Sequence, residues 1–383
     1  MTGKQSFPLL ISADGGGDWQ ARGLFRVRLS AVRSPSGRGS LHIPELDGLR
    51  GLAVLWVILY HLQVHWPGRM HFFAGVASMG WMGVDIFFAL SGFLITRILL
   101  RCERDAGGLR NFYIKRALRI WPLYYCLLAL FCCELVWTRA PYPVFRCAVF
   151  VQNYLPQFVY PHNFDQTWSL CVEEHIYLVW PILVLFLPRA SLPWLLLSVL
   201  AGCPALRWAA VQHGVSAKLI YTASQYRLDS IALGSLLACL RQAEPRRCSP
   251  ARLRSAGTAV LAVSAPALIW FWRQSPGSFG SLPVYLFLAL VSGSSLCVAL
   301  TSAGTWAGAV LAAGPLRYAG KISYGLYMIH PFVFGAVSRK AQSLGGLAAA
   351  VVLSFVLAAL SWRFMERRVL EWRTVLLQRK GES

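Results

Sequence analysis

Charged residues are scarce in this chain of 383 residues: Asp, Glu, Lys and Arg make up only 14% of it, whereas 56% of the residues are hydrophobic. Soluble domains carry about 25% charged residues, so the composition excludes an ordinary soluble protein. The sequence also lacks paired CxxC motifs, and most of its 10 cysteines fall in apolar runs. We therefore interpret the cysteines as packing residues and expect no metal site.

What the chain has instead is a series of apolar runs, each long enough to cross about 30 Å of hydrocarbon. These runs predict an all-α, polytopic membrane protein with about ten transmembrane helices, near residues 46–66, 80–100, 118–137, 172–188, 192–212, 225–241, 255–272, 282–301, 315–336 and 346–366. Four prolines, at 141, 143, 156 and 161, interrupt or flank the apolar stretch around 142–160, which predicts a loop rather than a further span.

Basic residues outnumber acidic ones, 37 to 16, and give a formal net charge of +21. If the N-terminus lies inside, most of the Lys and Arg residues fall on the inner side, as the positive-inside rule describes. An even number of spans then predicts an N-in, C-in topology. We interpret most of the basic residues as groups that fix the topology and contact anionic lipids of the bilayer, and we expect no nucleic acid as a partner.

One membrane domain accounts for most of the chain. Residues 1–40 are rich in Gly, Ser and Arg and lack the apolar core of a signal peptide, which predicts a flexible basic N-terminal tail. Residues 41–372 form the predicted membrane domain, and residues 373–383 form a short C-terminal tail. The sequence shows no internal repeat.

The first predicted span carries an arginine and a histidine eleven residues apart, Arg50 and His61. Eleven steps of 100° make almost three turns, so both residues share one stripe of the helix, about 16 Å apart along its axis. Ionisable groups within a membrane are costly unless they face a cavity or other helices. The stripe therefore predicts half of an active site.

Further motifs follow along the chain in a fixed order. They are GVDIFFALSGFLIT at 83–96, NFYIKRALRIWP at 111–122, TWSLCVEEHIY at 167–177, YRLDSIALG at 226–234, GKISYGLYMIHP at 320–331 and SWRFMER at 361–367. Together with Arg50 and His61 they resemble the integral-membrane acyltransferase family 3, which includes O-antigen acetylases and macrolide acyltransferases, over about residues 44–372.

The resemblance implies transfer of an acyl group, usually acetyl, from cytoplasmic acyl-CoA to a hydroxyl of a glycan or similar acceptor. It implies a multi-pass protein of the cytoplasmic, or inner, membrane, with acyl-CoA as a co-substrate and no permanently bound cofactor. It also implies that Arg50 and His61 match the family's arginine and histidine separated by ten residues.

The chemistry can be argued from the residues alone. Acyl transfer from a thioester to an alcohol needs a base for the attacking hydroxyl, and a histidine suits that task. We assign the base to His61. A carboxylate that orients its second nitrogen would assist, and the predicted topology nominates Glu173 and Asp85, with Glu173 favoured.

Two further sets of residues are assigned by the predicted sidedness. Cations on the inner side suit the phosphates of CoA: Arg50, Arg97, Lys115, Arg116, Arg119 and Lys321. The simpler interpretation of such cations is that they fix topology. Polar and aromatic groups toward the outer side suit an acceptor: Trp168, Glu174, Tyr327 and His330. We interpret Arg227 and Asp229 as a structural ion pair, and Ser91 and Gly92 as small residues for close helix packing.

The main alternative is a proton-coupled transporter, because buried ionisable residues in a polytopic protein also describe a carrier. The absence of an inverted repeat and the concentration of arginine on one side argue against it.

Overall fold

The computed structural model describes residues 43–102, 105–139, 143–155, 164–243, 249–274, 282–369 and 371, and within these ranges the regular structure is helical. The two predicted tails, 1–40 and 373–383, lie outside the described residues. The helices are α1 (Pro44–His65), α2 (Ala74–Ala77), α3 (Gly83–Leu99), α4 (Ala106–Thr138), α5 (Val144–Ala148), α6 (Trp168–Phe186), α7 (Leu192–Gln212), α8 (Ala217–Thr222), α9 (Leu228–Ala243), α10 (Pro250–Gln274), α11 (Leu282–Thr301), α12 (Trp306–Leu311), α13 (Gly314–Lys321), α14 (Ser323–Ser338) and α15 (Leu344–Ser361), which continues into a π-helical turn η7 (Trp362–Glu366).

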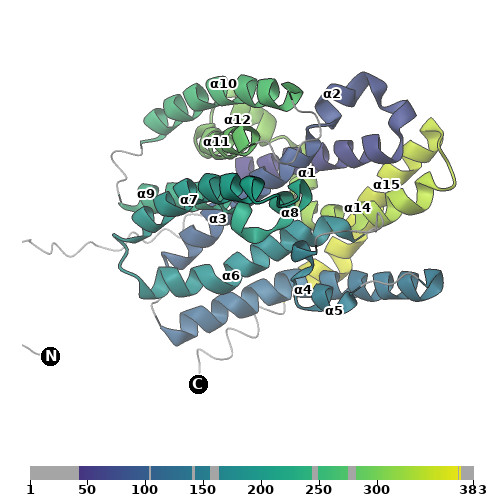
Figure 1. Cartoon of the computed structure of the whole chain (residues 1–383), viewed down its shortest axis with the longest axis horizontal. Coiled ribbons are helices and arrows are strands. Elements are labelled where there is room, and N and C mark those ends of the chain that lie inside the picture. Colours follow the sequence, from purple (N-terminus) through teal and green to yellow (C-terminus); the bar gives the residue numbers. More distant parts are fainter. Residues whose placement is uncertain are drawn as a thin grey trace, which may run out of the picture. The chain divides into compact units, whose positions relative to one another are not determined.

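In the described part of the chain, the long helices run beside one another. Figure 1 shows α10 and α11 along one edge, α4 along the opposite edge, and α3, α6, α7 and α9 between them. Helix α14 packs against both α1 and α15, and α13 packs along α1. This arrangement places α1, α3, α4, α6 and α14 around a common interior.

The all-α, polytopic class is confirmed, because seven of the described helices are long and apolar enough to cross a membrane. They are α3 with the turns before it, α4, α6, α7, α10, α11 and α15 with η7. Helices also occupy the other three predicted spans, but α9 and α14 are only 16 residues long, and α1 carries acidic residues in its first turn. The total number of crossings and the N-in, C-in sidedness stay predictions.

The shortened helices have local causes. The predicted span 225–241 begins within a 3-10 turn, Ser224–Tyr226, so α9 starts only at Leu228. The predicted span 315–336 is broken at Ile322, where α13 ends and α14 begins. The stretch 142–160 contains the short helix α5 and a 3-10 turn, Gln152–Tyr154, which is consistent with the predicted loop.

Glycines allow two pairs of helices to approach backbone to backbone. A Cβ atom on Gly92 of α3 would overlap the carbonyl oxygen of Ile231, and one on Gly234 of α9 would overlap that of Ala89. The same holds between α1 and α13, where Gly320 lies against the backbone of Asp47. Small residues at helix contacts are the usual means of close packing in membranes, so the packing role predicted for Gly92 is confirmed.

The contact between α3 and α9 yields a stability prediction. Gly234→Ala places a methyl group against the Ala89 carbonyl, and we expect a loss of about 1–3 kcal/mol in the free energy of unfolding. The matched control is Gly202→Ala on α7, where nothing lies within 4 Å of the added carbon, and better helix propensity makes it neutral or slightly stabilising. Thermal unfolding of the purified protein in detergent measures both. Equal melting temperatures would contradict the close approach of α3 and α9.

Candidate active site

Three cavities lie in succession along α13 and α14. The first, of about 310 Å³, lies between α1, α3, α4, α6 and α14, and we call it the Glu173 cavity. The second, of about 570 Å³, is the Lys321 cavity, and it shares Arg50, Arg119, Ser323 and Tyr324 with the first. The third, of about 530 Å³, is the Arg363 cavity, and it shares Tyr318, Lys321 and Trp362 with the second. The shared lining residues make the three cavities direct neighbours, and we call the series of three the path.

The two outer chambers carry most of the positive charge. Arg317 and Lys321 line the Lys321 cavity, and Arg363 and Arg367 line the Arg363 cavity. The ammonium group of Lys321 also lies 5.3 Å from the ring centre of Trp362, within the range of a cation–π contact. This end of the path suits a ligand with several negative charges and a planar group.

The structure brings together four of the six residues predicted to bind acyl-CoA. Arg50, Arg116, Arg119 and Lys321 line the path, whereas Arg97 and Lys115 lie outside these three cavities. Three further arginines that were not predicted to bind the donor also line these cavities: Arg317, Arg363 and Arg367. Arg317 and Arg363 are predicted to lie on the same side of the membrane as Lys321, and this shared side is the sequence feature that could have identified them.

Glu173 sits on the wall of the innermost chamber and accepts two hydrogen bonds from hydroxyl groups. Ser91 Oγ donates to Oε1 at 2.6 Å, and Tyr177 OH donates to Oε2 at 2.9 Å. The guanidinium of Arg116 lies 5.3 Å from the ring centre of Tyr177. The packing role predicted for Ser91 is therefore incomplete, since its hydroxyl is bonded to Glu173.

His61 obtains its orientation from its own helix. Its Nδ1 lies 2.9 Å from the carbonyl oxygen of Val57, one turn earlier on α1. A carbonyl can only accept, so Nδ1 carries the proton, and Nε2 of the neutral ring keeps a free lone pair. Among the described residues, neither Glu173 nor Asp85 is hydrogen-bonded to His61 as predicted, because the carboxylate of Glu173 accepts from Ser91 and Tyr177 and that of Asp85 from Arg227 and Ser230.

His330 on α14 faces His61. The two ring centres are 4.7 Å apart at 73°, and Nδ1 of His330 lies 2.7 Å from the carbonyl oxygen of Leu326, again one turn earlier. His330 is completely buried, and its Nε2 has no hydrogen-bond partner among the described residues. The structure thus contains a pair of imidazoles in the same tautomer, one on each of two packed helices.

Tyr327 lies between the Glu173 cavity and this histidine pair. It lines the cavity, and its ring centre is 6.2 Å from that of His330. Its hydroxyl is bonded to Ser169 Oγ at 2.6 Å and donates to the carbonyl oxygen of Gln166 at 2.8 Å. Tyr327 therefore contacts both the Glu173 cavity and the ring of His330.

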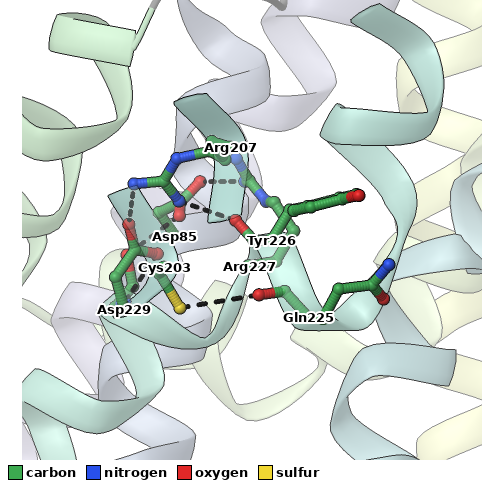
Figure 2. A network of polar contacts seen from close by, with 8 residues as sticks. Asp85, Cys203, Arg207, Gln225, Tyr226, Arg227 and Asp229 are labelled. Atoms are coloured by element: carbon green, nitrogen blue, oxygen red, sulfur yellow. Dashed lines mark hydrogen bonds and ion pairs between the residues drawn. The ribbon is translucent and has the colours of Figure 1, made fainter. Parts of the chain in front are cut away.

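Asp85 belongs to a buried ion network away from the cavities. Figure 2 shows Arg227 paired with Asp85, at 2.6 Å, and Arg207 paired with Asp229, at 2.8 Å. The other carboxylate oxygen of Asp85 accepts from Ser230 Oγ at 2.9 Å. The predicted pairing of Arg227 with Asp229 is therefore wrong, because α3 supplies the partner of Arg227 and α7 supplies that of Asp229.

The other two predicted acceptor residues lie apart from the histidine pair. The ring centre of Trp168 lies 5.4 Å from the guanidinium of Arg227, so Trp168 covers the ion network. Glu174 Oε2 accepts from Trp121 Nε1 at 3.3 Å. Trp168 and Glu174 lie outside the three cavities, unlike Tyr327.

The arrangement defines a class of protein: a helical membrane protein in which a series of cationic cavities lies near a pair of packed histidines, His330 buried and His61 partly exposed. The chain belongs to the family described as acyltransferase domain, which matches residues 43–365, and the resemblance drawn from the motifs is confirmed.

Curated relatives support this assignment. The chain is 29% identical to the peptidoglycan O-acetyltransferase OatA of Listeria monocytogenes, over 85% of this chain and 55% of the relative. It is also 29% identical to the putative peptidoglycan O-acetyltransferase YrhL of Bacillus subtilis, over 86% and 55%, and 24% identical to a putative O-acetyltransferase of Staphylococcus aureus, over 87% and 59%. The chain thus spans a little over half the length of these relatives. No solved structure matches it.

The ion network yields a second stability prediction. Asp85→Asn leaves Arg227 buried without its countercharge, which we expect to cost about 3–5 kcal/mol of the free energy of unfolding. The double variant Asp85→Leu with Arg227→Met removes both charges and should recover much of the loss. Chemical or thermal unfolding in detergent measures each variant.

The control removes an acid from an exposed pair. Glu371→Gln breaks the ion pair with Arg367, in which the side chains of Arg367 and Glu371 are 65% and 58% exposed. This change should lower the free energy of unfolding by less than about 1 kcal/mol. If Asp85→Asn were no more destabilising than this control, the network would not hold α3 and α9 together.

Proposed function

We propose that the chain is an O-acyltransferase of the cytoplasmic membrane that moves an acyl group, acetyl in the simplest case, from acyl-CoA to a hydroxyl of a cell-envelope glycan. The observation that supports the proposal is the path of three neighbouring cavities, cationic at its outer end, with Tyr327 of the innermost cavity in contact with the histidine pair. The glycan acceptor is inferred from the relatives named as peptidoglycan O-acetyltransferases.

The dimensions and polarity of the path suit CoA. The phosphates and the adenosine occupy the two outer chambers, against Arg317, Lys321 and Arg363, because arginine and lysine bind phosphate well. The pantetheine arm passes Arg50 and Arg119, which line two adjoining chambers. The thioester then reaches the Glu173 cavity, whose walls combine apolar side chains with a few polar groups.

The reaction uses the free lone pair of His61. Nε2 accepts the proton of the acceptor hydroxyl as its oxygen attacks the thioester carbon, so the C–O bond forms and the C–S bond breaks. The same proton then passes from Nε2 to the CoA thiolate. Displacement of Tyr327 from the inner end of the path brings the two substrates together.

Removal of the base gives the sharpest test. We expect His61→Ala to lower transfer of labelled acetyl from acetyl-CoA to soluble peptidoglycan fragments by at least about 100-fold, while thermal stabilisation by CoA persists. His65→Ala, one turn further along α1 and hydrogen-bonded to Ser338, is the matched control. Substantial transfer by His61→Ala would remove His61 from its role. A carrier would instead show substrate flux in proteoliposomes and no acetyl transfer.

The cationic path makes a separate prediction for donor binding. Lys321→Ala and Arg119→Ala should each raise the KM for acetyl-CoA roughly tenfold, with little change in kcat, since each removes a charge-assisted contact worth about 1.5 kcal/mol. Lys115→Ala removes an exposed lysine outside the three cavities and should leave KM unchanged. An effect of Lys115→Ala equal to that of Lys321→Ala would place the donor elsewhere.

A further inference from the structure

The Lys321 cavity contains a carboxylate for which the proposed chemistry has no use. Glu366 lines this cavity, and its side chain belongs to a residue that is only 9% exposed. Four cations line the same cavity: Arg50, Arg119, Arg317 and Lys321. Among the described residues none of them forms an ion pair with Glu366, and Arg50 pairs with Asp47 instead. A buried carboxylate normally has a partner, so the partner of Glu366 remains to be identified.

The π-helical turn η7 sets the direction of the Glu366 side chain. Ser361 Oγ donates to Glu366 Oε1 at 3.1 Å, although the two residues are five positions apart. In an α-helix that spacing would separate the two side chains by about 140° around the axis. In η7 the backbone N–H of Arg367 bonds to the carbonyl of Trp362, five residues earlier. This wider turn brings Ser361 and Glu366 to one side, and such turns are frequent at functional sites.

The two carboxylate oxygens of Glu366 have different surroundings. Oε1 accepts from Ser361 and packs against α14, where a Cβ atom on Gly325 would lie 3.1 Å from it. Oε2 has no hydrogen bond or ion pair among the described residues. Because Glu366 lines the Lys321 cavity, Oε2 is the oxygen that a ligand there can reach. An ionised carboxylate only accepts, so this ligand must carry a hydrogen-bond donor.

Trp362 adds a flat surface beside this acceptor. It lies four residues before Glu366 and lines both the Lys321 and the Arg363 cavities. Aromatic side chains of this kind stack on nucleic-acid bases. The phosphates of CoA offer acceptor oxygens and no donor at neutral pH. Adenine is the planar part of CoA, and its exocyclic amine is a donor at the edge of the ring, which fits an indole surface next to a carboxylate.

We propose that Glu366 is a specificity-determining residue that accepts a hydrogen bond from the exocyclic amine of the donor's adenine, while Trp362 stacks on the ring. The inference rests on the proposed function, because it takes acyl-CoA as the donor. Arginine and lysine bind any phosphate, including that of the phosphopantetheine arm of an acyl carrier protein. Glu366 and Trp362 therefore select free acyl-CoA over a donor that lacks adenine.

The test compares CoA with an analogue in which hypoxanthine replaces adenine, so that a carbonyl oxygen stands in place of the amine. Calorimetric titration of the full chain in detergent measures both affinities. We expect the wild-type protein to bind CoA about 10- to 100-fold more tightly than the analogue, the value of one hydrogen bond to a charged group. Glu366→Gln should bind the two nearly equally, because an amide can present either its oxygen or its NH₂ group.

Two further variants separate reading of the base from other effects. Asp47→Asn changes another carboxylate of the same cavity and should keep the wild-type preference for CoA. Ser361→Ala removes the hydrogen bond that orients Glu366, so it should lower the preference although the carboxylate remains. Thermal unfolding without ligand checks that each variant is folded. With 4′-phosphopantetheine, which lacks adenosine, Glu366→Gln should bind as tightly as the wild-type protein.

The outcomes distinguish this inference from the proposed function. The inference is overturned if the wild-type protein binds CoA and the hypoxanthine analogue equally, or if Glu366→Gln keeps the preference for CoA. It is also overturned if Glu366→Gln weakens binding of phosphopantetheine as much as that of CoA. Each of these results leaves the proposed function standing, whereas a wild-type protein that binds neither CoA nor phosphopantetheine overturns both.

Discussion

The hydrogen bond from His61 Nδ1 to the carbonyl oxygen of Val57 is the interaction on which the proposed chemistry depends. Because donor and acceptor belong to the same helix, α1 alone fixes the tautomer of the ring and leaves Nε2 as a base. His330 repeats the arrangement on α14 with the carbonyl of Leu326. His330 can therefore be buried as a neutral imidazole beside the partly exposed His61, without the desolvation cost that a buried carboxylate would bring.

Helix α1 also joins the two ends of the proposed reaction path. Arg50 lines the chambers that would hold the donor, and His61 lies almost three turns further along the same stripe. The close approach of Gly320 on α13 to the backbone of Asp47 holds α13 against α1 beside the cationic chambers. The packing around the cationic cavities and the orientation of His61 thus both depend on α1. A single rigid helix suits a site that must keep its geometry.

Local periodicity made several features of the site predictable. The common stripe of Arg50 and His61 follows from the helical repeat, and the cavity positions of Arg116, Arg119 and Lys321 are consistent with their predicted sidedness. The seven long apolar helices follow from hydrophobic length. Each of these predictions needs only the pattern of residues along a single helix, or the difference in charge between the two sides of the membrane.

Features that depend on pairing between helices were not predictable. Asp229 is two residues from Arg227 in sequence, yet α3 supplies the partner of Arg227 and α7 that of Asp229. The hydrogen bond from Ser91 to Glu173 likewise joins α3 to α6. The π-helical turn η7, which brings Trp362 and Glu366 to the Lys321 cavity, is a local irregularity without a periodic signal. Tertiary packing decides the first two, and the third has no pattern in the sequence that would reveal it.

The most direct test of the central claim is an experimental structure of the full chain with a non-hydrolysable acetyl-CoA analogue. We predict phosphate density against Arg317, Lys321 and Arg363, the pantetheine arm past Arg50 and Arg119, and the acyl carbon beside Tyr327, displaced toward His61. A nucleotide bound elsewhere, or His61 turned away from His330 into the hydrocarbon, would contradict it.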